Sequence, residues 1–461
     1  MLLRAGGLCL IVPCLTVSAD IFPANLGELF EERSKAVVAV EFFVQGEIER
    51  SPFDTAGLVA DEQGLIVLID SAIPGWIPID RFRDFRVFVP GEGGDGHDAE
   101  YLGRDHVSGW HYLRASSEAA AKLVPISRFD RSVPRVGDPL WGIGILGRDF
   151  DHVPYLLDGR LALIQRLPLK FGFSEQLLAV PGGPVFSADG GFAGWAGNPL
   201  TQERLLLMDG RRATVGLQAV DESGVFLLSD EFFDKVGRLP KNPAGDPRPW
   251  IGITGMQPID RDVAEYLGLA EQGALVVSTV LENTPADEAG LMDKDIIVGV
   301  NGASLPKFRP DNIVQRYFER LVLERMPGEI LELTLRRGEE TVVVDVEVGK
   351  HPKPINQAAR QYFSDLGFTV REFAVFDAIR QRVSFAEATG VISDFVKPNS
   401  PVNSAGLRQG DWIKEIDGTQ VASYADALEI LDRIEGDGSR DDFVMLIDRN
   451  NETSHLRVKL R

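Results

Sequence analysis

The sequence predicts a mainly β protein built from about three domains. Its 461 residues exceed one domain, since domains of roughly 100–200 residues are usual. Residues 36–230 consist of short β-branched and aromatic runs separated by Gly and Pro, a rhythm typical of an all-β barrel or sandwich. The second half carries one domain-sized pattern twice. The strands expected in the first half are 37–44, 57–59, 65–69, 85–89, 140–145, 161–167, 183–186 and 191–196.

Composition excludes several classes of protein. Apolar residues make up 44% and charged residues 25%, the balance of a folded chain. The 47 Gly and 27 Pro follow no period, so the chain is neither collagen-like nor of low complexity. The formal charge of -21 would repel phosphate backbones and anionic lipid head groups. We therefore expect no nucleic-acid partner. The sequence contains no His-x-x-x-His pair and no His/Cys cluster, so we also expect no metal. No cofactor is expected either.

The amino terminus, residues 1–19, has the features of a secretory signal. Arg4 provides a positive start, and an apolar run follows over residues 8–17. Small or modest residues then lead to Ala19, where a signal peptidase would cleave. We therefore expect export to the bacterial periplasm or cell envelope, with removal of this segment.

Two other fates of this segment stay open. It could act as a membrane anchor, although the apolar run is short for a bilayer and contains Pro13. Alternatively Cys14 could be lipidated, although Pro13 before it fits a lipobox poorly. If residues 1–19 are removed, Cys9 and Cys14 leave with them and the formal charge falls by one to -22. The mature chain would then be free of thiols and disulfides, with no stable membrane insertion expected.

The repeat in the second half is defined by turn and helix signals. Residues 284–302 and 400–418 each contain Ser/Thr-Pro, then Ala-Gly-Leu, then Asp, then Asn-Gly or Asp-Gly, at an offset of 116 residues. Ser/Thr-Pro favours the start of a short helix and the Gly its end. Asn-Gly and Asp-Gly favour tight turns between strands. The period is the size of a domain, which indicates tandem domains and not a solenoid.

This repeated pattern resembles PDZ domains of the HtrA/Deg type. The resemblance implies a groove between a strand and a helix, where the C-terminus of a partner adds a strand. Helices at about 311–325 and 423–434 would border the two grooves, and an apolar last residue would be favoured on the partner. Lys294 departs from the family, which usually has Gly there. The predicted peptide-binding loops are Trp250, Ile251, Gly252 and Ile253 in the first copy, and Asp365, Leu366, Gly367 and Phe368 in the second.

The first half resembles the chymotrypsin-like protease domain of the same family. The similarity lies in residues 57–66, 103–105, 136–144 and 182–194. The implied fold is a chymotrypsin-like double β-barrel followed by two PDZ domains, which are α+β and partly open barrels. The implied division of the chain is a signal at 1–19, a barrel domain at 20–240, and PDZ domains at 246–350 and 351–461.

The residues expected at the catalytic positions cannot perform the family's chemistry. By resemblance, Pro181 stands at the serine, Ser71 at the histidine and Gly109 at the aspartate. Proline offers neither a nucleophile nor the N–H that would help to stabilise an oxyanion. Ser71 cannot act as a base near neutral pH. Two nearby hydroxyls, Ser174 and Ser187, are not expected to replace the missing nucleophile.

We therefore predict a pseudoprotease that binds peptides or protein C-termini through its PDZ domains, in a scaffold, chaperone-like or regulatory role. Two alternatives remain. One is an active serine endopeptidase in envelope protein quality control, which would require a different alignment of the motifs. The other is a non-catalytic partner subunit of an active HtrA protease. For the oligomer, the resemblance implies either a homotrimer or a hetero-oligomer with an active HtrA relative. No catalytic residue is assigned by the sequence.

Overall fold

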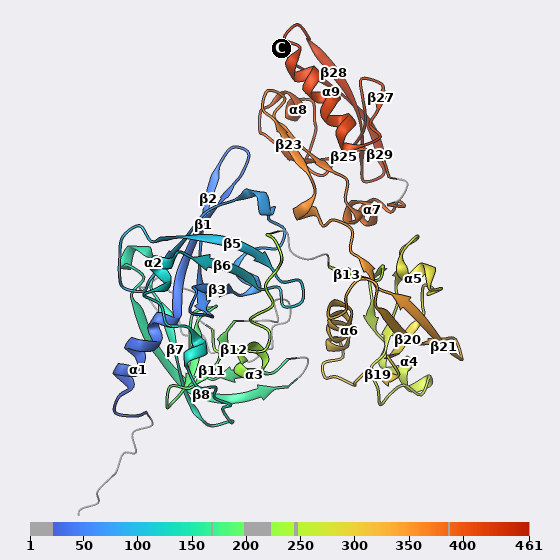
Figure 1. Cartoon of the computed structure of the whole chain (residues 1–461). Helices are drawn as coiled ribbons and strands as arrows, with labels where there is room; N and C mark the ends of the chain where they lie inside the picture. Colours follow the sequence, from blue (N-terminus) through green and yellow to red (C-terminus); the bar gives the residue numbers. More distant parts are fainter. Residues whose placement is uncertain (1–21, 167–168, 198–222, 244–247, 386–387, 461) are drawn as a thin grey trace, which may run out of the picture.

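The computed structural model describes residues 22–460 apart from 167–168, 198–222, 244–247 and 386–387. Along the chain it forms two closed barrels and then two smaller units (Figure 1). We call the smaller units the middle unit, residues 249–351, and the C-terminal unit, residues 355–460. The predicted signal and both cysteines lie outside the described residues.

The first barrel closes in the strand order β1-β2-β3-β6-β5-β4. Strands β1 and β2 pair from Val37↔Leu58 to Gln45↔Arg50. Apolar side chains alternate inward along the strands, because successive residues of a strand point to opposite faces. Its strands are β1 (Val37–Gln45), β2 (Arg50–Val59), β3 (Leu65–Leu68), β4 (Phe82–Phe88), β5 (His97–Arg104) and β6 (His111–Ala115).

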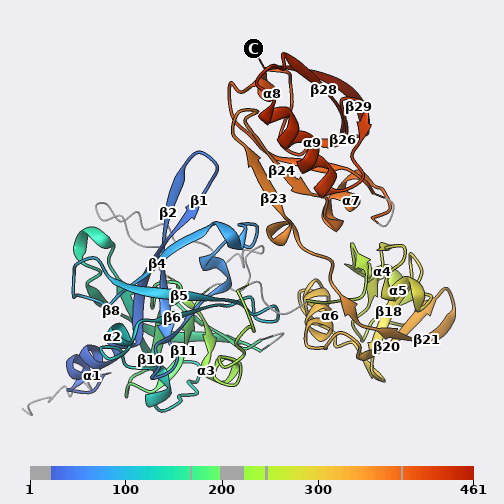
Figure 2. The same cartoon turned by 45° about the horizontal axis from the view of Figure 1, so that its top comes forward.

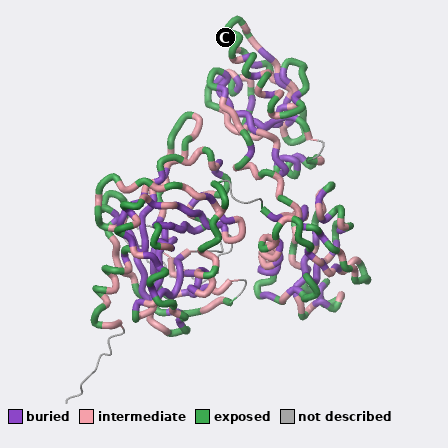
Figure 3. The backbone as a smooth tube through the Cα atoms, viewed as in Figure 1, coloured by how far each residue is buried: buried purple, intermediate pink, exposed green. Residues whose placement is uncertain are grey.

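The second barrel closes in the order β10-β11-β12-β9-β8-β7. Buried residues line the strands of both barrels (Figure 3). The closed barrels agree with the all-β expectation, although β5, β6, β9 and β12 were not among the expected strands. Its strands are β7 (Pro139–Ile145), β8 (Pro154–Gln165), β9 (Phe171–Ser174), β10 (Pro184–Ser187), β11 (Phe192–Ala196) and β12 (Val225–Leu228).

The two barrels share a buried aromatic cluster. Helix α1 (Leu26–Arg33) precedes the first barrel, α2 (Ser117–Ala120) follows it, and α3 (Ser229–Phe232) follows the second. The ring of Trp110 lies 5.2 Å from that of Trp195 and 5.1 Å from that of Phe232. Trp110 belongs to the first barrel and the other two rings to the second, so apolar burial holds the barrels together.

The middle unit is a small α+β fold. Its main sheet runs β15-β16-β18-β20-β21, and two short pairs, β13 with β22 and β14 with β17, lie beside it. Its strands are β13 (Pro249–Trp250), β14 (Ile253–Thr254), β15 (Gln257–Pro258), β16 (Leu275–Val276), β17 (Thr279–Val280), β18 (Ile296–Val300), β19 (Ala303–Ser304), β20 (Ile330–Arg337), β21 (Glu340–Glu347) and β22 (Gly349–Lys350). Its helices are α4 (Arg261–Tyr266), α5 (Pro285–Glu288) and α6 (Ile313–Leu323).

The C-terminal unit repeats this arrangement with one rearranged edge. Its sheet runs β23-β24-β25-β26-β28-β29, and β27 pairs with β26. Its strands are β23 (Arg360–Phe363), β24 (Phe368–Glu372), β25 (Val391–Val396), β26 (Trp412–Ile416), β27 (Thr419–Gln420), β28 (Asp442–Arg449) and β29 (Glu452–Lys459). Its helices are α7 (Val375–Gln381), α8 (Pro401–Ser404) and α9 (Tyr424–Gly436).

The tight turns predicted from the repeat form in both units. Asn301 and Gly302 carry β18 into β19 with φ of 51° and 74°, and the same turn joins β26 to β27. Lys294, the departure from the family pattern, adopts a φ of 72°, close to the 89° of Gly410 at the matching position. The turn therefore keeps its shape despite the Cβ atom.

Side-chain caps begin helices α8 and α9 but not α5. The hydroxyl of Ser400 accepts the N–H of Asn403 at 3.2 Å, and Ser423 caps α9 in the same way. Thr284, which precedes α5, does not cap. Its hydroxyl donates instead to the carbonyl of Leu281 at 2.6 Å.

The C-terminal unit also touches the first barrel. Strands β1 and β2 form a long hairpin that reaches toward this unit (Figure 2). At its tip the carboxylate of Glu47 accepts a hydrogen bond from the hydroxyl of Thr369, on β24, at 2.7 Å. Arg81 of the barrel forms an ion pair with the same carboxylate.

Candidate functional site

Two of the three positions aligned with the catalytic triad lie at one end of the first barrel. Ser71 sits in a short 3-10 turn, Asp70–Ala72, directly after β3. Gly109 sits in the loop that joins β5 to β6. The two loops touch, because a Cβ atom built on Gly109 would lie 2.6 Å from Oδ1 of Asp70. Gly109 has a φ of 78°, which a residue with a side chain rarely adopts.

Arg104 holds these two loops together. Its Nε donates to the carbonyl of Gly109 at 3.1 Å, and its guanidinium pairs with Asp70. The side chain beside the histidine position is therefore a carboxylate already engaged by an arginine. Ser71 contributes a hydroxyl here, and neither Asp70, Ser71 nor Arg104 carries an imidazole that could accept a proton from a nucleophile.

Pro181 lies in the loop before β10, in the second barrel. Gly182 packs against the first barrel, since a Cβ atom built on it would lie 2.4 Å from the carbonyl oxygen of Ala56. The N–H of Gly182 donates to Ala196 and that of Gly183 to Val180, both at 2.8 Å. The loop thus offers no N–H at Pro181, and the next two amides are used within the barrel.

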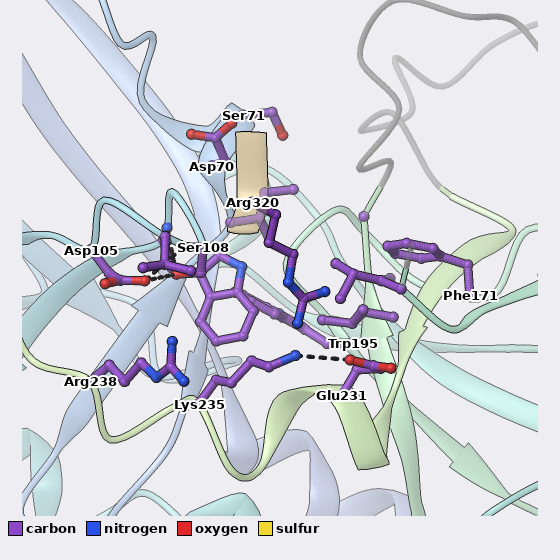
Figure 4. A pocket seen from close by; sticks show the side chains of 17 residues that line it. Asp70, Ser71, Asp105, Ser108, Phe171, Trp195, Glu231, Lys235, Arg238 and Arg320 are labelled. Carbon is purple, nitrogen blue, oxygen red and sulfur yellow. Dashed lines mark hydrogen bonds and ion pairs between the residues drawn. The ribbon is translucent and has the colours of Figure 1, made fainter. Parts of the chain in front are cut away.

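A cavity of ≈ 220 Å³ lies beside these loops (Figure 4). Ser71 and Asp70 reach it from the first barrel, Phe171 and Trp195 from the second, and Arg320 from helix α6 of the middle unit. The lining combines aromatic faces with charged groups of both signs. Of the three aligned positions only Ser71 lines it, and it joins three parts of the chain.

The other serine of this cavity, Ser108, has a structural partner. Its hydroxyl donates to Oδ2 of Asp105 at 2.6 Å, and its own N–H donates to the same oxygen at 2.7 Å. Asp105 is buried. These bonds fix the loop that carries Gly109, because the N–H of Gly109 also donates to the carbonyl of Asp105 at 2.9 Å. An acyl-transfer nucleophile needs a base beside it, and among the lining residues no histidine is present.

The two substitute hydroxyls are engaged in turns. Ser174, at the end of β9, accepts the N–H of Gln176 at 3.1 Å. Ser187, at the end of β10, donates to Oδ1 of Asp189 at 2.5 Å and to the carbonyl of Gly191 at 3.1 Å.

His111, two residues after Gly109, belongs to the core of the first barrel. It begins β6 and is buried, with Nδ1 2.9 Å from the hydroxyl of Tyr101. Burial, aided by the positive charge of Arg104, lowers the pKa of His111 to about 3. His111 is therefore a neutral core residue, paired across the sheet with Leu68 and Arg104.

The first predicted peptide-binding loop, Trp250–Ile253, leads into β14. Gly252 has a φ of 88°, and a Cβ atom there would lie 2.2 Å from that of Thr284, so only Gly fits. Its carbonyl accepts the N–H of Leu281 at 2.9 Å. The side chain of Ile253 is partly buried and packs against the apolar core. Within the described residues β14 pairs with β17 alone.

Helix α6, which the resemblance predicts to border a groove, contributes two apolar side chains. Tyr317 and Leu321 are partly buried and pack on the same core as Ile253. The predicted helix, 311–325, is two residues longer at each end than the observed one. This part of the middle unit thus contains a strand, a helix and apolar side chains of both that pack on one core.

The second predicted loop, Asp365–Phe368, has the same local geometry. Gly367 has a φ of 79° and faces Ser400 as Gly252 faces Thr284. Its surroundings differ, however, because β23 lies along the outer edge of β24. The sequence-based prediction did not include β23, since its residues carry none of the family's motif. Whether either loop binds a peptide stays a prediction.

Two further observations concern expected absences. Among the described residues, no group of three or more His, Cys, Asp or Glu is arranged to hold a metal ion. Within the same part of the chain, no helix is long and apolar enough to cross a membrane.

Comparisons with known proteins identify relatives of the chain. The sequence profile of the PDZ domain family matches residues 245–318. The chain is 28% identical over 205 residues to a probable periplasmic serine endoprotease, DegP-like, from Rhizobium meliloti (strain 1021), covering 41% of this chain and 37% of that protein. A DegP-like relative of the same description from Chlamydia pneumoniae is 24% identical over 264 residues, 55% of this chain and 50% of that protein. The chain is a relative of the HtrA-type serine proteases.

The fold of the chain is confirmed by a solved structure. A variant of the HtrA-type protease AlgW with a tripeptide superposes with a TM-score of 0.50 and 16% identity, over 71% of this chain and 98% of that one. With the two closed barrels and the PDZ match, this confirms the mainly β, chymotrypsin-like fold class. The chain spans between about a third and a half of the curated relatives it matches.

Proposed function

We propose that this HtrA-type chain is a pseudoprotease that binds peptides or protein C-termini through its PDZ region. The observation that carries the proposal is the set of residues at the aligned catalytic positions, Ser71, Gly109 and Pro181. Serine-type acyl transfer requires a nucleophile, a base and an orienting group as a unit. The contacts around Gly109 and Pro181 support this, because both loops are held by bonds within the barrels.

Peptide binding is supported by the groove of the middle unit. Residues 245–318 match the PDZ family and contain the loop at Gly252 and the first half of helix α6, Ile313–Leu323. A peptide that adds to the edge of β14 would place its last side chain near Ile253, Tyr317 and Leu321. We therefore expect a partner with an apolar last residue.

The absence of proteolysis is tested with the purified chain from residue 20 onward. Digestion of unfolded casein and labelling by a fluorophosphonate are measured beside an active HtrA-type protease. We expect no turnover and no labelling. Casein turnover that is lost on Ser71→Ala, Ser174→Ala or Ser187→Ala would contradict the proposal, as would covalent labelling of any serine.

Peptide binding is tested by fluorescence anisotropy with a library of labelled peptides that end in a free carboxylate. We expect micromolar binding of peptides with an apolar last residue. Ile253→Asp should weaken it at least tenfold, because it places a charge in the apolar groove. The matched control is Val343→Asp, since Val343 is 57% exposed on β21. Equal loss in both variants, or no binding tighter than millimolar by the unmodified chain, would overturn this part of the proposal.

We place the mature chain in the periplasm. The relatives are named periplasmic proteases, and residues 1–19 have the pattern of a secretory signal. Fractionation and N-terminal sequencing of the mature protein should yield Asp20 as the first residue. Retention of Cys14 as a lipidated first residue would contradict cleavage after Ala19. Light scattering of the purified chain, alone and mixed with an active HtrA-type protease, distinguishes a stand-alone binder from a partner subunit.

A further inference from the structure

Strand β23 lies where a partner peptide would lie in the C-terminal unit. Its residues pair antiparallel with β24, from Arg360↔Arg371 to Phe363↔Phe368. On its other side β24 pairs with β25, in the same way that β14 pairs with β17 in the middle unit. A peptide that binds a PDZ domain adds to the remaining edge, antiparallel and with its last residue at the loop. In the C-terminal unit that edge is taken.

Side chains of β23 fill the space between β24 and helix α9. Phe363 is fully buried, with its ring 6.0 Å from that of Phe368, in the same core cluster as Leu431 of α9. Two residues earlier, the side-chain amide of Gln361 donates to Asp432 of α9 at 3.1 Å. One side chain is thus buried at the loop, and another reaches the helix from two residues upstream.

The main chain of β23 also occupies the loop that would hold a carboxylate. The N–H of Gly367 donates to the carbonyl oxygen of Phe363 at 2.8 Å. The N–H of Asp365 donates to Glu435 of α9 at 2.7 Å. A free C-terminus would need such N–H groups for its oxygens, and in this structure two of them already have acceptors.

In the middle unit, the segment that corresponds to β23 does not pair with β14. Arg248 stands at the position of Phe363, 115 residues earlier, and it is exposed. Its carbonyl accepts the N–H of His351 at 2.8 Å, and Pro249 pairs with Lys350 of β22. These bonds lead the chain away from β14. The two copies therefore share the loop but differ in what precedes it.

We infer that residues 360–363 are a built-in ligand of the C-terminal groove, and that this groove binds an external C-terminus only when β23 leaves it. The inference deepens the proposed function, since it rests on a PDZ-type groove. The built-in strand also defines the external ligand. It is a peptide with an aromatic last residue, as Phe363 is, and a hydrogen-bonding side chain two residues before it, as Gln361 has.

The test uses the chain from residue 20 onward with Ile253→Asp, which silences the middle unit. The probe is a fluorescent decapeptide that ends in Arg-Gln-Tyr-Phe with a free carboxylate, and its amidated form is the control. Adding Phe363→Ala should tighten binding of the free-acid peptide at least tenfold and leave the amidated peptide unbound. Phe376→Ala, which removes an exposed ring from α7 of the same unit, should have no effect. Hydrogen exchange at the amide of Gly367 should accelerate at least tenfold in Phe363→Ala.

A second variant tests the inference in case Phe363→Ala fails to fold. Gln361→Cys with Asp432→Cys joins β23 to α9 by a disulfide in a chain that otherwise has no cysteine after residue 14. At high peptide concentration the reduced form should bind the free-acid peptide, and the oxidised form should not. Equal binding by both forms would overturn the inference. So would a folded Phe363→Ala with fast exchange at Gly367 and no gain in binding.

Failure of the inference can be told from failure of the proposed function. The proposed function fails if the chain with Ile253 intact binds no C-terminal peptide. The inference can hold even then, because the gain on Phe363→Ala is measured with the middle unit silenced.

Discussion

Arg337 donates through Nη2 to Oδ2 of Asp295 at 2.7 Å, and through the same nitrogen to the carbonyl of Gly290 at 2.8 Å. Asp295 is only 1% exposed. One guanidinium thus ties the end of helix α5 and the start of β18 to strand β20. The C-terminal unit contains the same clamp, in which Arg449 binds Asp411.

Removal of this arginine should destabilise the middle unit. Arg337→Met leaves the carboxylate of Asp295 buried without its charged partner, which costs about 3–5 kcal/mol in comparable cases. Because the Arg337 side chain is 32% exposed, solvent screens the pair and we expect about 2 kcal/mol. Hydrogen exchange of the β18 amides measures the stability of this unit. Arg336→Met, on the neighbouring position of β20, is the control, and equal losses would contradict the role of the clamp.

Lys294→Gly should stabilise the middle unit. Lys294 has a φ of 72°, a conformation that costs a residue with a side chain roughly 1–2 kcal/mol. Gly relieves that cost but loses more entropy on folding, so a net gain of about 0.5–1 kcal/mol is expected. Urea unfolding read by the same β18 amides measures it. Lys294→Ala keeps the Cβ atom and should change little; a gain as large as that of Gly would show that the side chain, not the backbone, is responsible.

Acid should destabilise the first barrel through His111. The native imidazole stays neutral down to a pKa of about 3, whereas the unfolded residue binds a proton below about 6.5. The unfolded state therefore binds more protons between these values, and stability falls as the pH falls through this window. Between pH 7.5 and 5.0 the loss from this residue is about 2 kcal/mol.

His111→Gln should remove that loss while keeping a polar partner for Tyr101. The measurement compares urea unfolding of the variant and the parent at both pH values, read by tryptophan fluorescence. His455→Gln, at an exposed position of β29, is the control and should follow the parent. A His111→Gln variant with the same pH dependence as the parent would contradict the assignment.

Gly109→Ala should destabilise the first barrel more than an equivalent change elsewhere. The new Cβ would lie 2.6 Å from Oδ1 of Asp70, at a φ of 78°. We expect a loss of about 2–3 kcal/mol. Gly137→Ala has a φ of 98° but no atom within 4 Å of the new Cβ, so it should lose only about 1 kcal/mol. Calorimetric melting of both variants measures the difference. Equal shifts in melting temperature would show that the Asp70 side chain moves away from the new Cβ at little cost.

Local signals in the sequence determine much of the architecture. Asn301 and Gly302 turn β18 into β19 because both adopt positive φ, and the offset of 116 residues alone predicts a second turn like it. Strand β5 was missed because His97–Arg104 alternates charged residues with few apolar ones. It forms because the barrel closes only when β4 and β6 have a common neighbour.

The candidate site also has one part that the sequence predicts and another that it does not. Pro181 lacks an N–H and a nucleophile in any fold, so the sequence alone predicts the loss of serine chemistry. The cavity could not be predicted, because Trp110, Trp195 and Arg320 come from three parts of the chain. The burial of His111 is likewise a property of the assembled barrel.

The two peptide loops show where the sequence stops and the tertiary structure decides. Gly252 and Gly367 stand 115 residues apart in matching motifs, and the sequence by itself determined two alike loops. Which strand lies beside each loop depends on competition between distant edges. Trp250 pairs with β22, while Phe363 turns back onto β24 and is buried under α9. Strand pairing is chosen by the burial and hydrogen bonds it completes, and these exist only in the folded chain.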